Sequence, residues 1–206
     1  RADSFLNGNP YSSGSAITSE GSYELKIEAT DKAGNRATDT YTFYIDKTKP
    51  TSNITIGEPK LETGGNIFVS GSTLFTLSAG DGGTVSSGIN NIEYRINGST
   101  WTLYALPFNL SGLADGTVTI DYRAVDTAGN VEDYHTVTLK ADNTSPDTSL
   151  NIGTPKFIGA DGTVYITPTT DITLSASDSL SGVMKTEYRI DGGQWLNYAA
   201  FTLPSE

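Results

Sequence analysis

The feature that most constrains the fold is a set of sequence blocks that recur in the same order at nearly the same spacing. The block DKTKP at residues 46–50 returns as DNTSP at residues 142–146, which is 96 residues later. The block EYRING at residues 93–98 returns as EYRIDG at residues 187–192, which is 94 residues later. Recurrence at a fixed period is typical of repeat architectures, in which each repeat is one structural unit. The sequence therefore predicts a module of about 95 residues.

This period divides the chain into one complete module and two partial ones. Residues 1–46 carry the C-terminal half of a module, residues 47–142 a complete module, and residues 143–206 the N-terminal half of a third. The chain opens at Arg1 in the middle of the pattern, so we expect it to be cut from a longer array. The alternative is that the two halves complement each other by strand addition, within one chain or between chains.

Each module is expected to contain a hairpin with an alternating pattern. Residues 118–124 alternate apolar and polar side chains, which is the period-2 signal of a strand with one buried face. The strand runs into DTAGN at residues 126–130, where Asp and Asn can bond nearby backbone and Gly129 can take a positive φ. The same pattern leads through residues 23–29 into DKAGN at residues 31–35. Both sites therefore predict hairpin turns.

The expected fold class is all-β, in the form of tandem immunoglobulin-like β-sandwich modules, one complete and two partial. About seven short strands with frequent turn signals fit into the complete module, and no stretch has the pattern of a long amphipathic helix. The Asn-Gly turn at residues 97–98 is a strong hairpin signal, and it places Trp101 and Tyr104 on the returning strand.

Composition and motifs argue against several classes of function. The net charge of −11 and the pI near 4.4 argue against nucleic acid as a partner, because nucleic-acid binding needs a basic surface. No apolar run approaches the roughly 18 residues of a membrane helix, so no membrane insertion is expected. The chain has no Cys, no hydrolase or phosphate-loop motif, and a single histidine, His135, that faces no evident partner. We therefore expect no enzyme activity.

The order of these motifs resembles the tandem bacterial Ig-like and fibronectin-III-like repeats of secreted and surface proteins. The residues that carry the resemblance are DKTKP, TLSA, EYRI, the Asn-Gly turn and YRAVDTAGN, together with DKAGN in residues 1–46. The resemblance implies an extracellular or cell-surface location and a non-catalytic spacer or stalk of a larger protein, with neighbouring modules as partners. The alternatives are an adhesin module that binds a carbohydrate or a host or cell-surface protein, and an accessory region of a secreted glycoside hydrolase.

Carboxylates are expected to gather at one pole of each module. In an Ig-like sandwich the entry linker, the loop after the second strand and the final hairpin loop lie near one another, and Ca²⁺ takes about six to eight oxygen ligands. The simpler interpretation is that these residues form turns and caps, because no local run has the spacing of a dedicated Ca²⁺ loop. No other cofactor is expected. The candidate calcium ligands are Asp46, Asp81, Asp126 and Asn130 in the complete module, and Asp142 and Asp178 in the third copy.

Large aromatic side chains give a second candidate site in each copy. Trp101 with Tyr104, and Trp195 with Tyr198, follow the same turn in the two copies and could offer ring faces to a glycan. The simpler interpretation is that these rings cover the core of a small sandwich, because large aromatics supply much of its buried apolar area.

Overall fold

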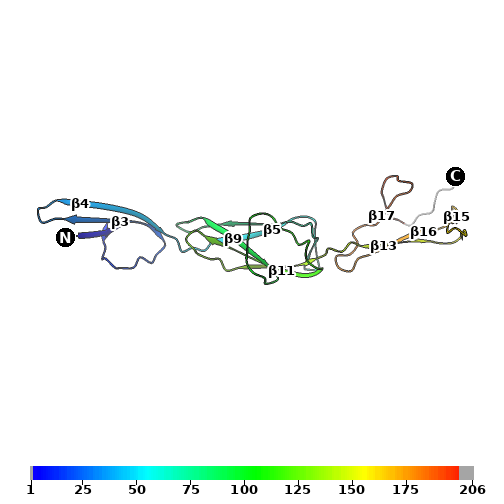
Figure 1. Ribbon diagram of the computed structural model, residues 1–206, viewed down its shortest axis with the longest axis horizontal. Helices are drawn as coiled ribbons and strands as arrows, with labels where there is room; N and C mark the ends of the chain where they lie inside the picture. Colours follow the sequence, from blue (N-terminus) through cyan, green and yellow to red (C-terminus); the bar gives the residue numbers. More distant parts are fainter. Residues whose placement is uncertain (1, 200–206) are drawn as a thin grey trace. The chain divides into compact units, whose positions relative to one another are not determined.

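The computed structural model describes residues 2–199, and every regular element in that range is a β-strand (Figure 1). The all-β prediction is therefore confirmed. Within the described range, no helix is long and apolar enough to cross a membrane. The strands are β1 (Ala2–Leu6), β2 (Asn9–Pro10), β3 (Gly21–Thr30), β4 (Arg36–Ile45), β5 (Thr51–Ile56), β6 (Lys60–Thr63), β7 (Asn66–Val69), β8 (Phe75–Gly80), β9 (Ile89–Ile96), β10 (Thr102–Leu103), β11 (Gly116–Asp126), β12 (His135–Ala141), β13 (Asp147–Ile152), β14 (Lys156–Ile158), β15 (Val164–Ile166), β16 (Ile172–Ser177), β17 (Glu187–Tyr188) and β18 (Leu196–Asn197).

The described chain divides into two compact units. Unit 1 consists of residues 2–58, 73–109 and 118–139, and unit 2 consists of residues 59–72, 110–117 and 140–199. Each unit draws on several stretches of the sequence. In unit 2, for example, the parallel pairing of Lys140 with Phe68 and of Ala141 with Val69 joins residues 59–72 to the residues that follow position 139. The module boundaries after residues 46 and 142 stay a prediction.

In unit 1, the N-terminal strands form a four-stranded sheet in the order β2-β1-β3-β4. The β3–β4 hairpin is paired from Gly21↔Ile45 to Thr30↔Arg36, so the alternating pattern of residues 23–29 does mark a strand. Asp31 closes the hairpin, since its Oδ1 accepts the backbone N–H of Asn35 and its Oδ2 accepts the Asn35 side-chain amide, both at 2.8 Å. This confirms the predicted turn at DKAGN.

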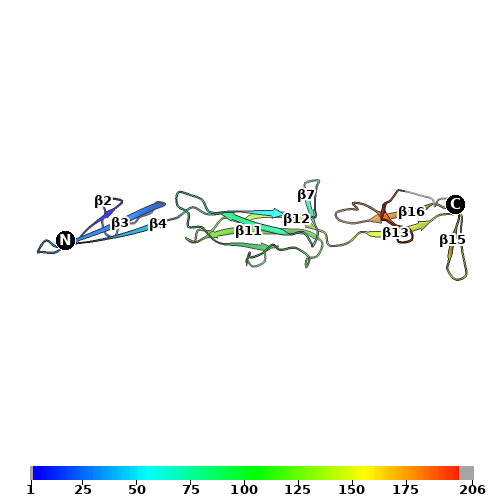
Figure 2. The same ribbon diagram turned by 90° about the horizontal axis from the view of Figure 1, so that it is seen from above.

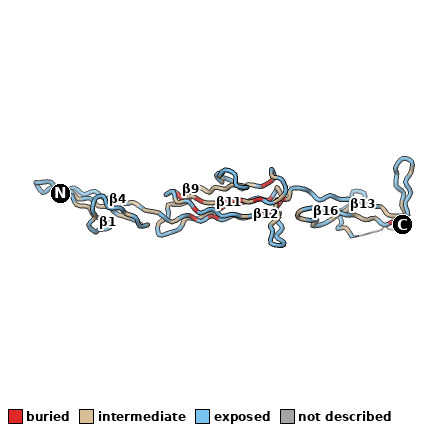
Figure 3. Tube along the Cα trace, turned by 90° about the horizontal axis from the view of Figure 1, so that it is seen from below, coloured by how far each residue is buried: buried red, intermediate tan, exposed pale blue. Residues whose placement is uncertain are grey.

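The core of unit 1 lies on β8, β11 and β12. Val118 and Ile120 on β11 are 2% and 0% exposed, and the apolar residues at alternate positions of this strand are buried as the sequence predicts. Asp121, between Ile120 and Tyr122, is buried as well. Figure 3 shows the buried segments along the strands around β11. The Phe108 ring stacks on Tyr94 with the ring centres 4.0 Å apart. The buried apolar residues of this unit are Phe75, Leu77, Val118, Ile120, Tyr122, Ala124 and Leu139.

β9, β11 and β12 belong to a six-stranded sheet in the order β10-β9-β11-β12-β7-β6, and Figure 2 shows β11 and β12 along one another. β5 and β8 form a separate antiparallel pair. The short β10 strand corrects one expectation. It contains only Thr102 and Leu103, so Trp101 and Tyr104 flank the returning strand instead of lying within it.

In unit 2, β13 pairs with β16 as β5 pairs with β8 in unit 1. The β5–β8 register ends at Ile56↔Phe75, and the β13–β16 register ends at Ile152↔Ile172. These partners lie 96 and 97 residues apart in the sequence, so the repeat seen in the sequence is also a repeat of strand pairing. β14 with β15, and β17 with β18, form two further antiparallel pairs of this unit.

Candidate functional site

Asp126 is the fixed point of the candidate metal centre. It ends β11 and is fully buried. Its Oδ1 accepts the backbone N–H of Asn130 at 2.7 Å, and its Oδ2 accepts the Asn130 side-chain amide at 2.7 Å. Gly129 has a φ of 93°, which lets the chain turn back within these few residues. The DTAGN sequence therefore holds the Asp126 carboxylate in one place.

Asp46 and Asp81 reach the same place from the linker and from the loop after β8. Asp46 Oδ1 accepts the backbone N–H of Thr48 at 3.1 Å, and its Oδ2 accepts that of Ser87 at 2.7 Å. Asp81 Oδ2 accepts the backbone N–H of Gly88 at 2.8 Å. Both carboxylates are thus oriented by backbone groups.

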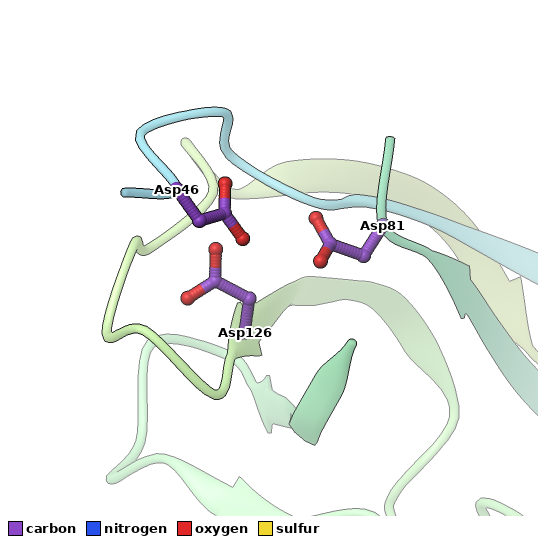
Figure 4. Close-up of side chains that lie close together, drawn as sticks. All are labelled: Asp46, Asp81 and Asp126. Atoms are coloured by element: carbon purple, nitrogen blue, oxygen red, sulfur yellow. The ribbon is translucent and has the colours of Figure 1, made fainter. Parts of the chain in front are cut away.

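The three carboxylates form one cluster, shown in Figure 4. Asp46, Asp81 and Asp126 each offer an oxygen, and these oxygens lie within 4.8 Å of one another. The Asp81 Oδ1 atom is buried and has no hydrogen-bond partner among the described residues. Hydrogen bonds from Ser87 and Thr48 hold the pKa of Asp46 below its ordinary value, although burial opposes this shift. Charged carboxylates this close repel one another, and a divalent cation would remove that repulsion.

The other predicted metal ligands are placed differently. The side-chain nitrogen of Asn130 donates to Asp126 Oδ2 and, at 3.2 Å, to the carbonyl oxygen of Asp46, so its amide braces the cluster. In unit 2, Asp142 Oδ2 accepts the backbone N–H of Ser181 at 3.0 Å. Asp178 Oδ1 accepts the backbone N–H of Gly182 at 2.7 Å. Within residues 2–199, the structure brings no third acidic or histidine side chain close enough to Asp142 and Asp178 to form a comparable cluster.

The Trp101 ring lies under two guanidinium groups. The Cζ atoms of Arg123 and Arg95 are 4.2 Å and 4.7 Å from the ring centre, and the Tyr134 ring meets Trp101 edge-on at 6.0 Å. Arg123 Nη2 is 2.9 Å from Glu93 Oε2 across the sheet, which fixes that guanidinium. The Trp101 side chain therefore takes part in cation–π packing on the sheet surface.

The remaining predicted glycan-binding residues are Tyr104 in unit 1 and Trp195 and Tyr198 in unit 2. Trp195 is 59% exposed, and the Cζ of Arg189 lies 4.9 Å from its ring centre. Tyr104 and Tyr198 are half-buried, and their backbone N–H groups donate to carbonyl oxygens of the preceding strand region, each at 2.8 Å. Because this bond recurs in both copies, the two tyrosines share a place in the hairpin.

Glu132 was not identified from the sequence. Its carboxylate is 8% exposed and accepts the Ser52 backbone N–H, the Ser52 hydroxyl and the Ala124 backbone N–H, at 2.8, 2.6 and 2.9 Å. His135 Nε2 lies 2.8 Å from Glu132 Oε1, so the expectation that this histidine faces no partner is wrong. Burial raises the pKa of Glu132, but these hydrogen bonds outweigh it and the pKa lies below its ordinary value. The repeat gave no signal, because the equivalent residue of the first copy is Ala37.

A family model and two solved structures are similar to this chain. Residues 9–47 match the family model of a bacterial Ig-like domain. Fibronectin(III)-like modules of CbhA from Clostridium thermocellum are 17% identical over 69% of this chain and 77% of theirs, with a TM-score of 0.35. SGBP-B of the mixed-linkage glucan utilization locus of Bacteroides ovatus, solved with a mixed-linkage heptasaccharide, is 16% identical over 98% of this chain and 60% of its own, with a TM-score of 0.23. No curated protein sequence matches the chain. The match at residues 9–47 covers β2–β4 and supports an Ig-like repeat in an all-β chain.

Proposed function

We propose that this chain is a non-catalytic array of Ig-like modules that acts as a spacer or stalk of a larger extracellular or cell-surface protein. The observation that carries the proposal is the repeated strand pairing, in which β13–β16 reproduces the register of β5–β8. A chain that repeats a folded unit gains length, and proline in the intervening linkers stiffens the connection. The proposed modules are residues 1–46, 47–142 and 143–206, with the first and last incomplete.

The packing of Trp101 and the acidic charge of the chain also favour a spacer. Trp101 is packed against Arg95 and Arg123, which occupy ring surface that a sugar would need. The net charge of −11 disfavours nonspecific attachment to acidic surfaces. The bacterial Ig-like match supports an extracellular location by analogy.

Affinity electrophoresis tests the spacer against the adhesin alternative. The chain is run through native gels that contain mixed-linkage glucan, xylan or carboxymethyl cellulose. A spacer migrates at the same relative rate with and without polysaccharide. Retardation that disappears in Trp195→Ala, whose wild-type ring is 59% exposed, would contradict the proposal and favour a carbohydrate-binding module. Trp101→Ala is the matched control variant, because Arg95 and Arg123 already cover the Trp101 ring.

A second function is favoured by the acidic cluster of unit 1. We propose that Asp46, Asp81 and Asp126 bind Ca²⁺. The Oδ1 atom of Asp81, which is buried and accepts no hydrogen bond from a described residue, supports a cation as its partner. A ligand that binds only the folded state stabilises it by about 2.7 kcal/mol at a concentration one hundred times its Kd. The melting temperature should therefore rise with Ca²⁺ and return with chelator.

Two variants of equal charge separate this site from general charge screening. Asp81→Asn removes one cluster carboxylate, and we expect the Ca²⁺-dependent rise to be lost. Asp191→Asn changes an exposed turn residue of unit 2 to the residue found at the equivalent Asn97, and we expect the rise to remain. Equal responses of the two variants, or no response of the wild type to Ca²⁺, would contradict calcium binding.

A further inference from the structure

The first linker of the chain is bound by a carboxylate that precedes it by more than twenty residues in the sequence. Glu20 Oε2 accepts the Thr48 hydroxyl at 2.5 Å and the Lys47 backbone N–H at 3.4 Å. Glu20 Oε1 accepts the backbone N–H groups of Thr84 and Val85 at 2.7 and 3.3 Å. One side chain thus joins the linker to the loop after β8, all within unit 1. These bonds hold the pKa of Glu20 below its ordinary value.

The second linker is bound in the same way within unit 2. Asp115 Oδ1 accepts the Asn143 backbone N–H at 2.6 Å, and Asp115 Oδ2 accepts the Thr144 hydroxyl. The Asn143 side chain also donates to the carbonyl oxygen of Leu113 at 2.9 Å. Glu20 and Asp115 are 95 residues apart, and the two threonines are 96 residues apart. The arrangement therefore follows the sequence repeat.

The aspartate that opens each linker binds in the other direction along the chain. Asp46 accepts the backbone N–H of Ser87, and Asp142 accepts that of Ser181. These two serines are also equivalent, at a spacing of 94 residues. Each linker is therefore anchored twice, by an acid of the copy before it and through its own Asp to a loop of the copy after it.

We propose that the D-x-T-x-P segment is the recognition element of a clasp between consecutive copies, and that its partner is the acid immediately before the glycine that opens the hairpin strand. The acid is Glu20 before Gly21 in one copy and Asp115 before Gly116 in the next. The linker threonine supplies a hydroxyl donor, and hydrogen bonds to a carboxylate are about twice as strong as neutral ones. Each linker is thus a fixed joint and not a flexible tether. The clasp deepens the proposed spacer function. Only its role as a joint of a spacer rests on that function.

The fit around the first clasp is close. A Cβ atom built on Gly83 would lie 2.6 Å from Thr48 Oγ1 and 2.7 Å from Glu20 Oε1. The loop backbone therefore closes directly over the bond between these two side chains. Glutamate is one methylene longer than aspartate, which allows Glu20 to reach the loop at Thr84 as well as the linker. Among the described residues, the hydrogen bonds of Asp115 go to the linker alone.

Paired substitutions of the linker threonine test the clasp in the full chain. Thr48→Val keeps the shape of the side chain and removes its hydroxyl, whereas Thr48→Ser keeps the hydroxyl. The readout is amide hydrogen exchange at Thr84, whose N–H donates to Glu20. We expect exchange about tenfold faster in Thr48→Val and nearly unchanged in Thr48→Ser. Protection of Ile120, which is fully buried, reports in the same spectrum that the fold is intact.

A distance measurement shows whether the clasp fixes the joint. The chain has no Cys, so Thr38→Cys with Thr100→Cys gives two unique sites for spin labels. We expect a narrow distance distribution in the parent and in Thr48→Ser, and a broader one in Thr48→Val. The clasp would be overturned if the distance distributions of Thr48→Val and Thr48→Ser had equal widths, or if the Thr84 amide exchanged equally fast in these two variants. The chain would then be a spacer with loose joints. Polysaccharide binding would overturn the spacer function and leave the clasp intact.

Discussion

Glu132→Gln is the substitution whose effect can be worked out most fully from the structure. Each oxygen of this carboxylate accepts one backbone N–H, since Oε1 faces Ser52 and Oε2 faces Ala124. A glutamine must replace one of the two oxygens by an NH₂ group. A backbone N–H cannot turn around, so either orientation of the amide leaves one buried donor facing another donor. The substitution therefore removes a hydrogen bond that neither neighbour can replace.

The expected loss is about 2 to 3 kcal/mol of unfolding free energy at neutral pH. A buried donor without a partner costs about 1–3 kcal/mol, and hydrogen bonds to a charged acceptor are stronger than those to an amide. Urea denaturation should show a lower midpoint at an unchanged m-value. Glu62→Gln is the control, because this side chain is 61% exposed and pairs with Lys60 at the surface. A Glu132→Gln chain within about 0.5 kcal/mol of the parent would refute the reasoning.

The same carboxylate predicts a dependence on pH. Because the pKa of Glu132 is lower in the folded chain than in the unfolded chain, its stabilisation is complete above the unfolded value, about 4.3. The stabilisation is lost as the pH falls through the folded value. The stability difference between the parent and Glu132→Gln should therefore shrink in acid. A difference that is independent of pH down to about 3 would show that the charge of Glu132 contributes nothing.

Substitutions at two further positions, Asn97 and Gly71, test one turn and one close contact. Asn97 has a φ of 50° and its Oδ1 accepts the Thr119 N–H at 2.9 Å, so Asn97→Val should lower the unfolding free energy by about 2 kcal/mol. Asn97→Asp should stay within about 0.5 kcal/mol, because the third copy holds Asp191 at a φ of 48°; equal losses in urea denaturation would contradict this account. A Cβ on Gly71 would lie 2.8 Å from the Ser111 Cα, so Gly71→Ala should cost about 1–3 kcal/mol in the same assay, and an unchanged midpoint would contradict the close packing.

The sequence predicted the elements that depend on short-range periodicity. The alternation of residues 118–124 is a strand because a period of two buries one face, and β11 spans Gly116–Asp126. The repeat and the expected arrangement of loops at one pole also placed Asp46, Asp81 and Asp126 near one another, and the structure brings them together. Whether they bind calcium stays a prediction.

The surroundings of Trp101 could not be predicted, because they depend on cross-strand register. Arg95 lies opposite Asp121, and Arg123 lies opposite Glu93. The apolar alternation of β9 and β11 excludes a shift of one residue, which would turn one strand's side chains to the other face. A shift of two residues keeps the same faces and changes the partners, so the alternation alone does not select these pairs. The Glu132 site was missed for a related reason, since its partner Ser52 lies 80 residues away in the chain.

The central claim is that the chain is an array of modules and that the complete module, residues 47–142, folds on its own core. Folding of this segment as a separate polypeptide tests the claim most directly. Urea denaturation and amide exchange would be measured on this segment and on the full chain. We expect one cooperative transition for the segment and protected β11 amides, with Ile120 protected in both. A segment without a cooperative transition, or with an unprotected Ile120 amide, would contradict the modular account and the spacer function proposed from it.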